Sequence, residues 1–165
     1  MQHTEVVDLP EVEVALYLIG DFQPDRVAAA FDVVAKVVVA KGSERRRKST
    51  GEVLGIYQEA TWGFTSGDVV RSNEISDHVA WLVGKSAAAR SFLGQDVHAF
   101  LEVSLQNGTS CVLPESLLSF AGELSAEIGI VARTPRAAKT LGSGLSIAYD
   151  NERPDPKVPD PKVPA

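Results

Sequence analysis

The clearest hydrophobic pattern in the chain predicts a strand followed by a helix between positions 61 and 93. Trp62 and Phe64 are two residues apart, so a strand would place both rings on the same face of a sheet. After a turn at 67–68, apolar residues recur at the spacing of one helix face, at Ile75, Val79, Leu82 and Val83. We expect this strand and this helix to bury each other's apolar surfaces and to form the core.

Other segments carry weaker patterns of the same two kinds. Alternating or continuous apolar residues predict strands at 11–19, 52–58, 97–105 and 127–132. Pro24-Asp25 and Pro114 mark the starts of two further helices. The segment 33–40 is rich in β-branched residues and predicts a strand, whose boundary with the preceding helix stays open. Asn107-Gly108 predicts a hairpin that returns through residues 110–113.

These elements together predict the fold class α+β. We expect a mostly antiparallel sheet with two or three helices packed on one face, built from strand-helix-strand units of ferredoxin-like character. The single domain is expected at 1–133, with its core at about 12–133. Residues 134–165 are expected to form an extended C-terminal extension, because Asp-Pro-Lys-Val-Pro occurs there twice in tandem.

Charge and cysteine content narrow the range of functions. The chain has 165 residues, a formal net charge of −6 and one cysteine. A single cysteine excludes an intrachain disulfide and a cysteine-rich zinc site, and the negative charge argues against nucleic acid as a partner. The first residues lack the basic segment of a signal peptide, and no apolar run approaches the ~20 residues of a membrane span. We therefore expect a cytoplasmic protein without a membrane partner; the sequence does not indicate its oligomeric state.

No group of residues matches a catalytic, cofactor-binding or metal-binding motif. His98 shares a strand face with Glu102, but no third ligand stands at motif spacing. Cys111 has no signature that links it to a histidine, which favours a small buried hydrophobe. His78 borders the apolar stripe of its helix, which favours a partly buried, hydrogen-bonded histidine over a catalytic base. We expect no catalytic residue, cofactor or metal ion.

Two features favour contact with another protein. The segment 45–48 is the one basic run in an acidic chain. Such runs are usually solvated loops, but guanidinium groups also bind carboxylates through paired hydrogen bonds. Trp81 lies off the apolar stripe, where it either covers a second packed layer or, if exposed, anchors an interface. The candidate interface residues are Trp81, Arg45, Arg46 and Arg47.

Several short motifs follow one another in a recognisable order. They are Gly20-Asp21-Phe22, Pro24-Asp25, Lys41-Gly42, Trp62-Gly63-Phe64, a helix with His78, Leu82 and Val83, a helix start at Leu113-Pro114-Glu115, and the segment 122–128. In this order, over residues 12–133, the chain resembles the DUF4279 family of small bacterial proteins. That family has no established activity and is similar to immunity proteins of bacterial toxin systems, so the resemblance implies no catalytic residue. Residues 31–39 and the part beyond Thr134 depart from the family pattern.

Two functional hypotheses follow. The first is a non-catalytic protein-binding domain, such as an immunity or inhibitor protein that blocks a toxin or another protein through its acidic surface. The alternative is a small hydrolase or small-ligand-binding domain with a pocket near Trp62, His78 and His98. An exposed Trp81 on a flat acidic face would favour the first hypothesis, and a deep pocket with converging polar groups would favour the second.

Overall fold

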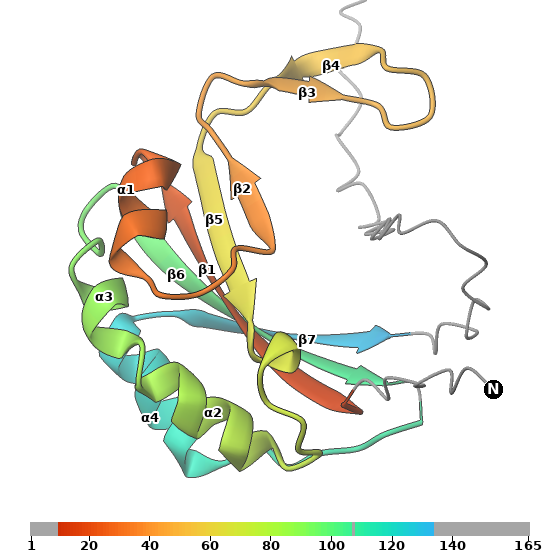
Figure 1. Cartoon of the computed structure of the whole chain (residues 1–165), viewed down its shortest axis with the longest axis vertical. Helices are drawn as coiled ribbons and strands as arrows, with labels where there is room; N and C mark the ends of the chain where they lie inside the picture. Colours follow the sequence, from red (N-terminus) through yellow and green to blue (C-terminus); the bar gives the residue numbers. More distant parts are fainter. Residues whose placement is uncertain (1–9, 107, 134–165) are drawn as a thin grey trace, which may run out of the picture. The chain divides into compact units, whose positions relative to one another are not determined.

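The structure is a computed structural model, and it describes residues 10–106 and 108–133. Contacts divide the chain into two compact units, Met1–Pro135 and Arg136–Ala165. All described residues belong to the first unit, and the predicted C-terminal extension lies outside them. Within the described part the fold is α+β, as predicted, and it has seven strands and four α-helices where two or three helices were expected (Figure 1).

A five-stranded mixed sheet forms the centre of the domain. Its strands lie in the order β2 (Val37–Val39), β5 (Ala60–Thr65), β1 (Val12–Gly20), β6 (Val97–Gln106) and β7 (Glu127–Arg133). Strand β1 is central and antiparallel to both neighbours, and β2 is antiparallel to β5. Only β7 runs parallel to its neighbour, β6. The predicted mostly antiparallel sheet is therefore confirmed.

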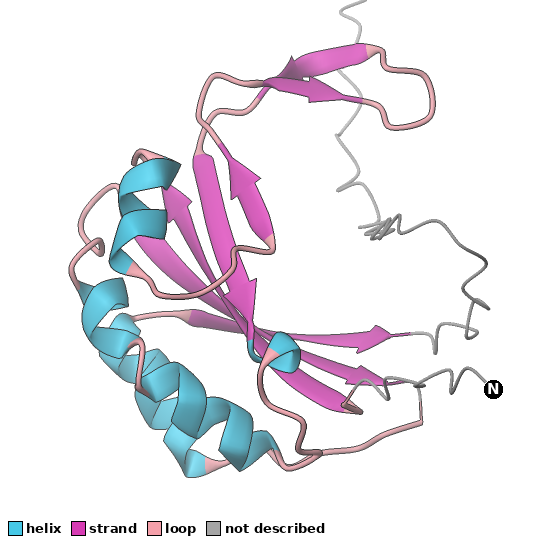
Figure 2. Cartoon of the chain, viewed as in Figure 1, coloured by secondary structure: helices cyan, strands magenta, loops and turns pink. Residues whose placement is uncertain are grey.

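The helices cover one face of this sheet (Figure 2). They are α1 (Pro24–Ala30), α2 (Ile75–Val83), α3 (Ser86–Arg90) and α4 (Glu115–Leu124), and a short 3-10 helix, η1 (Ser66–Asp68), follows β5. Each α-helix contributes apolar side chains to one core cluster, which also contains Leu16 and Leu18 of β1. Those leucines pair in register with Phe64 and Trp62, so both rings point into the core, as the sequence predicted.

The opposite sheet face is built differently. It carries an aromatic pair, Tyr17 and Phe100, whose ring centroids lie 6.3 Å apart on paired positions of β1 and β6. A Cβ atom at Gly63 would lie 2.2 Å from the Tyr17 ring, and one at Gly129 would lie 2.5 Å from the Phe100 ring. Glycine in the neighbouring strands therefore leaves the space that the two rings occupy over the sheet.

Of two predictions from local patterns, one holds in part and one was wrong. The segment 33–40 contains a strand, but only at 37–39, after an irregular stretch. Residues 110–113 form no return strand; the chain there is irregular and leads into α4. The position beside β6 is taken instead by β7, which arrives through the α4 crossover and must therefore run parallel to β6.

Candidate functional site

A two-stranded ribbon at residues 43–57 lies outside the main sheet. It pairs β3 (Glu44–Arg46) with β4 (Val53–Ile56), and it continues the connection between β2 and β5 (Figure 1). At its base, the Tyr57 N–H donates to the Ser43 carbonyl at 3.0 Å and the Gly42 N–H donates to the Tyr57 carbonyl at 2.8 Å. The sequence predicted a strand at 52–58 but only a basic run at 45–48, so the pairing of β3 with β4 was not predicted.

Large apolar side chains are exposed along this ribbon. The exposed fractions are 47% for Val53, 43% for Leu54, 56% for Ile56 and 36% for Tyr57. Successive side chains of a strand point to opposite faces, so both faces of the ribbon present apolar surface. The two strands pack chiefly on each other. An isolated two-stranded ribbon is marginally stable in water, which makes this exposed surface costly unless something covers it.

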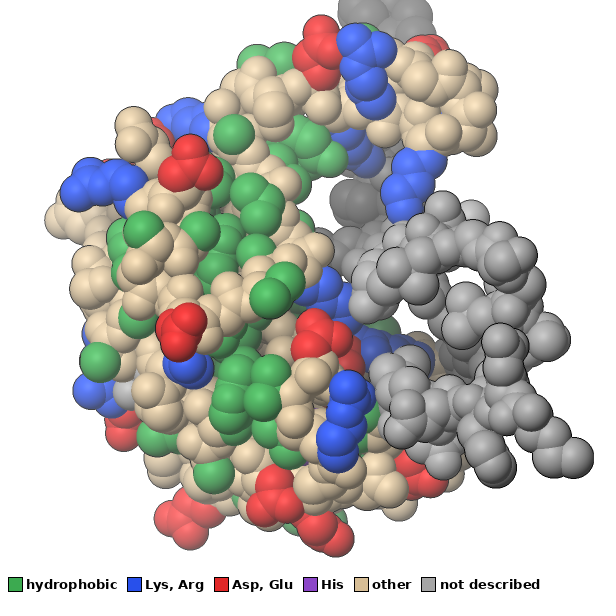
Figure 3. All heavy atoms as spheres, viewed as in Figure 1, with side chains coloured by type: hydrophobic (Ala, Val, Ile, Leu, Met, Phe, Trp, Pro, Cys, Tyr) green, Lys and Arg blue, Asp and Glu red, His purple; other side chains and the backbone are tan. Residues whose placement is uncertain are grey.

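The basic run lies on the same ribbon. Arg45 and Arg46 are in β3, and Arg47 follows directly. Arg46 forms an ion pair with Glu44, and Arg47 Nη1 lies 2.8 Å from Glu52 Oε2. Both pairs are at least half exposed, so each stabilises the fold by no more than about 1 kcal/mol. Figure 3 shows acidic and basic side chains next to each other over the ribbon.

Trp81 lies elsewhere. It is half-buried on α2, where its ring meets Phe64 edge-on at 5.6 Å between centroids. The Lys85 ammonium lies 5.8 Å from the Trp81 centroid. Trp81 therefore covers a second packed layer, one of the two alternatives left open by the sequence. Figure 1 shows α2 and the β3–β4 ribbon far apart, so the structure does not combine the predicted interface residues in one surface.

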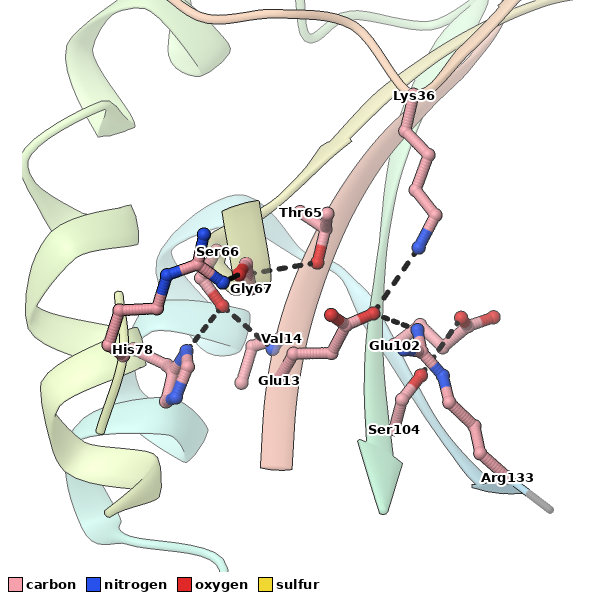
Figure 4. A network of polar contacts seen from close by, with 11 residues as sticks. Glu13, Val14, Lys36, Thr65, Ser66, Gly67, His78, Glu102, Ser104 and Arg133 are labelled. Atoms are coloured by element: carbon pink, nitrogen blue, oxygen red, sulfur yellow. Dashed lines mark hydrogen bonds and ion pairs between the residues drawn. The ribbon is translucent and has the colours of Figure 1, made fainter. Parts of the chain in front are cut away.

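His78 is fully buried in a hydrogen-bond network that joins η1, α2 and β1 (Figure 4). Its Nε2 lies 2.8 Å from the Ser72 carbonyl, which can only accept, so Nε2 carries the proton. Nδ1 then accepts from the Ser66 hydroxyl at 2.7 Å, and Ser66 Oγ accepts from the Val14 N–H at 2.9 Å. This serine–histidine pair has no solvent access, and its geometry is that of a structural tie.

The predicted pocket near Trp62, His78 and His98 does not form. Trp62 is fully buried in the core, 4.8 Å from Phe31 between ring centroids. His98 is exposed and points to the other face of the sheet, because its neighbour Ala99 points into the core. His98 instead lines a shallow hollow of ≈ 390 Å³. Lys41 also lines it, and a hydrogen bond to Asp21 raises the pKa of this lysine.

Glu13 is the buried charge that the sequence analysis missed. It lies on β1, and its side chain is 9% exposed. Lys36 Nζ lies 3.3 Å from Glu13 Oε1, and Arg133 at the end of β7 donates to the same oxygen (Figure 4). Two cations therefore hold this carboxylate in a largely buried site, and they tie β1 to both edges of the sheet. The signal was present, since Glu13 interrupts an apolar central strand.

We predict that Glu13→Gln lowers the free energy of unfolding by about 2–3 kcal/mol, because Lys36 and Arg133 would then face a neutral amide in a largely buried site. This is less than a fully buried pair would lose, since the Arg133 side chain is 37% exposed. Urea denaturation measures the change. The matched control is Glu44→Gln, which removes an exposed ion pair and should cost less than about 1 kcal/mol. Equal losses in the two variants would contradict the anchoring role.

Within residues 10–106 and 108–133, no three His, Cys, Asp or Glu side chains are grouped so that they could hold a metal ion. None of the helices described is long and apolar enough to cross a membrane. No protein-family model, curated protein or solved structure matches the chain.

Proposed function

We propose that this protein is a non-catalytic protein-binding domain, of the immunity or inhibitor kind, and that the β3–β4 ribbon is its contact surface. The observation that carries the proposal is the exposure of four large apolar side chains beside three arginines, on a ribbon that packs chiefly on itself. Burying one such side chain in a partner contributes about 1.5–3 kcal/mol. Apolar centres with arginine and tyrosine around them are typical of protein interfaces.

The charge of the ribbon indicates the chemistry of the partner. Residues 43–57 contain four cationic residues (Arg45, Arg46, Arg47, Lys48) and two carboxylates (Glu44, Glu52), a local charge of +2 in a chain of net charge −6. The exposed pairs Arg46–Glu44 and Arg47–Glu52 are weak, so their arginines can turn to carboxylates of a partner at little cost. We infer a partner protein with an apolar patch bordered by Asp and Glu. The first hypothesis placed the contact on the acidic surface of the protein. The present proposal places it on the β3–β4 ribbon instead.

The alternative function, a small hydrolase or ligand-binding domain, has no comparable support. Of the three residues of its predicted pocket, Trp62 and His78 lie in the core and His98 lies on the opposite sheet face. The Ser66–His78 pair has the 2.7 Å separation of a nucleophile and its base, but both residues have zero exposure. A substrate cannot reach a hydroxyl that is buried in this way.

We predict that Ile56→Lys weakens binding to the partner at least about tenfold, because it places a charge in the centre of the apolar patch. The partner is first identified by photo-crosslinking in the native host, with the crosslinker at position 56 of the full chain. The complex is then reconstituted from purified components and measured by calorimetry. If the partner is a toxin, co-expression of the wild-type chain restores growth of the arrested cells and co-expression of the Ile56→Lys variant does not.

The control for this experiment is Leu118 on α4, which is 52% exposed, close to the 56% of Ile56. A crosslinker at position 118 should capture no stoichiometric partner, and Leu118→Lys should leave the affinity unchanged. The proposed function is wrong if the same protein is captured from both positions, or if Ile56→Lys and Leu118→Lys bind it equally well.

A further inference from the structure

Among the described residues, strand β7 forms one edge of the main sheet. Among the strands described, none pairs with its outer side. The other edge, β2, is only three residues long, whereas β7 has seven. In a parallel ladder, alternate residues of a strand direct their N–H and C=O groups away from the partner strand. With respect to the part of the chain that the structure describes, β7 therefore presents a row of backbone donors and acceptors along its outer side.

The side chains of β7 do not protect this edge. Natural edge strands usually carry a charge, a proline or a bulge in their middle, which blocks pairing with another chain. In β7 the charged residues stand only at the two ends, Glu127 and Arg133, and the five residues between them are apolar. Ile130 and Val131 are 59% and 42% exposed, and they point to opposite faces of the sheet. Such an edge is suited to pairing with another strand.

The sequence of β7 is complementary to itself in the antiparallel direction. If two copies meet around Ile130, Glu127 of each copy lies opposite Arg133 of the other, and Gly129 lies opposite Val131. Arg133 already donates to Glu13, but a guanidinium group has five N–H donors, so it can also bind a second carboxylate. Opposite charges on facing positions stabilise a strand pair, and like charges destabilise it.

The end of α4 fixes β7 in this position. Ser125 adopts a left-handed conformation with φ 50°, and the Ala126 N–H donates to the Ala121 carbonyl at 2.8 Å. This hydrogen-bonded helix end turns the chain directly from α4 into β7. Residues 127–133 then pair with β6 from Phe100 to Gln106. The edge is therefore held as a regular strand before any partner arrives, which lowers the entropic cost of pairing.

We propose that two copies of this chain associate through β7 in an antiparallel, two-fold arrangement, which joins their five-stranded sheets into one continuous sheet. The occupant of the edge is a second copy because the charges at the ends of β7 complement each other only when the strand meets itself in this direction. The paired segment is short, so the dimer is reversible and its population rises with protein concentration.

Sedimentation velocity of the full 17.6 kDa chain, from micromolar to millimolar concentration, tests the proposal. We expect a reversible shift from monomer to dimer. Ile130→Lys places two lysines side by side at the two-fold axis and should raise the dissociation constant at least about tenfold. Glu127→Lys, which sets like charges opposite each other at both ends, should also weaken the dimer. Circular dichroism confirms that each variant is folded.

The matched control is Ile56→Lys, since Ile56 and Ile130 are 56% and 59% exposed and both lie on strands. This variant should keep the dimer and lose the partner proposed above, and Ile130→Lys should do the reverse. The two proposals can therefore fail separately. A chain that stays monomeric at millimolar concentration, or a dimer that Ile130→Lys does not weaken, would overturn pairing through β7.

Discussion

Gly20→Ala should lower the free energy of unfolding by about 4 kcal/mol, a large part of the 5–15 kcal/mol typical of a domain. Gly20 ends the central strand β1 with φ +145°, a conformation that residues with a Cβ atom rarely adopt. A Cβ atom there would also lie 1.9 Å from the Asp96 carbonyl oxygen. That carbonyl accepts the Asp21 N–H at 2.9 Å, so it cannot move without breaking the contact that joins β1 to the start of β6.

The chain offers a close control for this prediction. Gly55 in the β3–β4 ribbon has φ +144°, nearly the same as Gly20, but a Cβ atom there would meet nothing within 4 Å. Gly55→Ala should therefore cost only the backbone strain, about 1–2 kcal/mol. The difference between the two variants in urea denaturation measures the close approach to Asp96. Similar losses in both would show that backbone strain alone is responsible.

The core could be predicted from the sequence because its pattern is local. Trp62 and Phe64 share a face by simple alternation, and three of the four stripe residues mark the buried side of α2. The fourth, Val83, is 42% exposed. The same reasoning placed His78 beside the apolar stripe as a hydrogen-bonded residue. The structure confirms this and shows the side chain fully buried. Each of these inferences depends only on residues that are close to one another in the sequence.

Inferences that depend on distant pairing were less successful. Asn107-Gly108 has the composition of a hairpin turn, yet residues 110–113 do not return beside β6. That edge belongs to β7, which is about twenty residues further along and which no local signal assigns there. Likewise, the arginines at 45–47 do not indicate by themselves that they pair with β4 and that the ribbon leaves the main sheet. Which strands pair with each other is decided by competition between strands for the same edge. The conformational propensity of single residues does not describe that competition.

Glu13 illustrates a third kind of limit. Its position in an apolar strand is visible in the sequence, but Lys36 and Arg133 are 23 and 120 residues away. Their convergence follows from the order of the strands, since β1 lies between β5 and β6 and the cations come from the two edges of the sheet. The candidate interface shows the same limit. The sequence identified the arginines, but only the fold shows that Leu54 and Ile56 are exposed beside them.

His78→Ala should lower the free energy of unfolding by about 3 kcal/mol, through an unfilled cavity and the loss of one buried and one partly buried hydrogen bond. The Ser66 hydroxyl and the Ser72 carbonyl would both lose their partner. The control is His98→Ala on the exposed sheet face, which should change stability by less than about 0.5 kcal/mol.

A double-mutant cycle in urea separates the network from simple packing. Ser66→Ala alone removes the acceptor of the Val14 N–H and should itself cost about 1–3 kcal/mol. If Ser66 and His78 act as one unit, the double variant loses less than the sum of the single variants, by at least about 0.5 kcal/mol. Additive losses would mean that the hydrogen bond between Ser66 and His78 contributes nothing to stability. Such a result would leave η1 and α2 held together by the core alone, and of the two hydrogen bonds at Ser66 only the one donated by the Val14 N–H would contribute to stability.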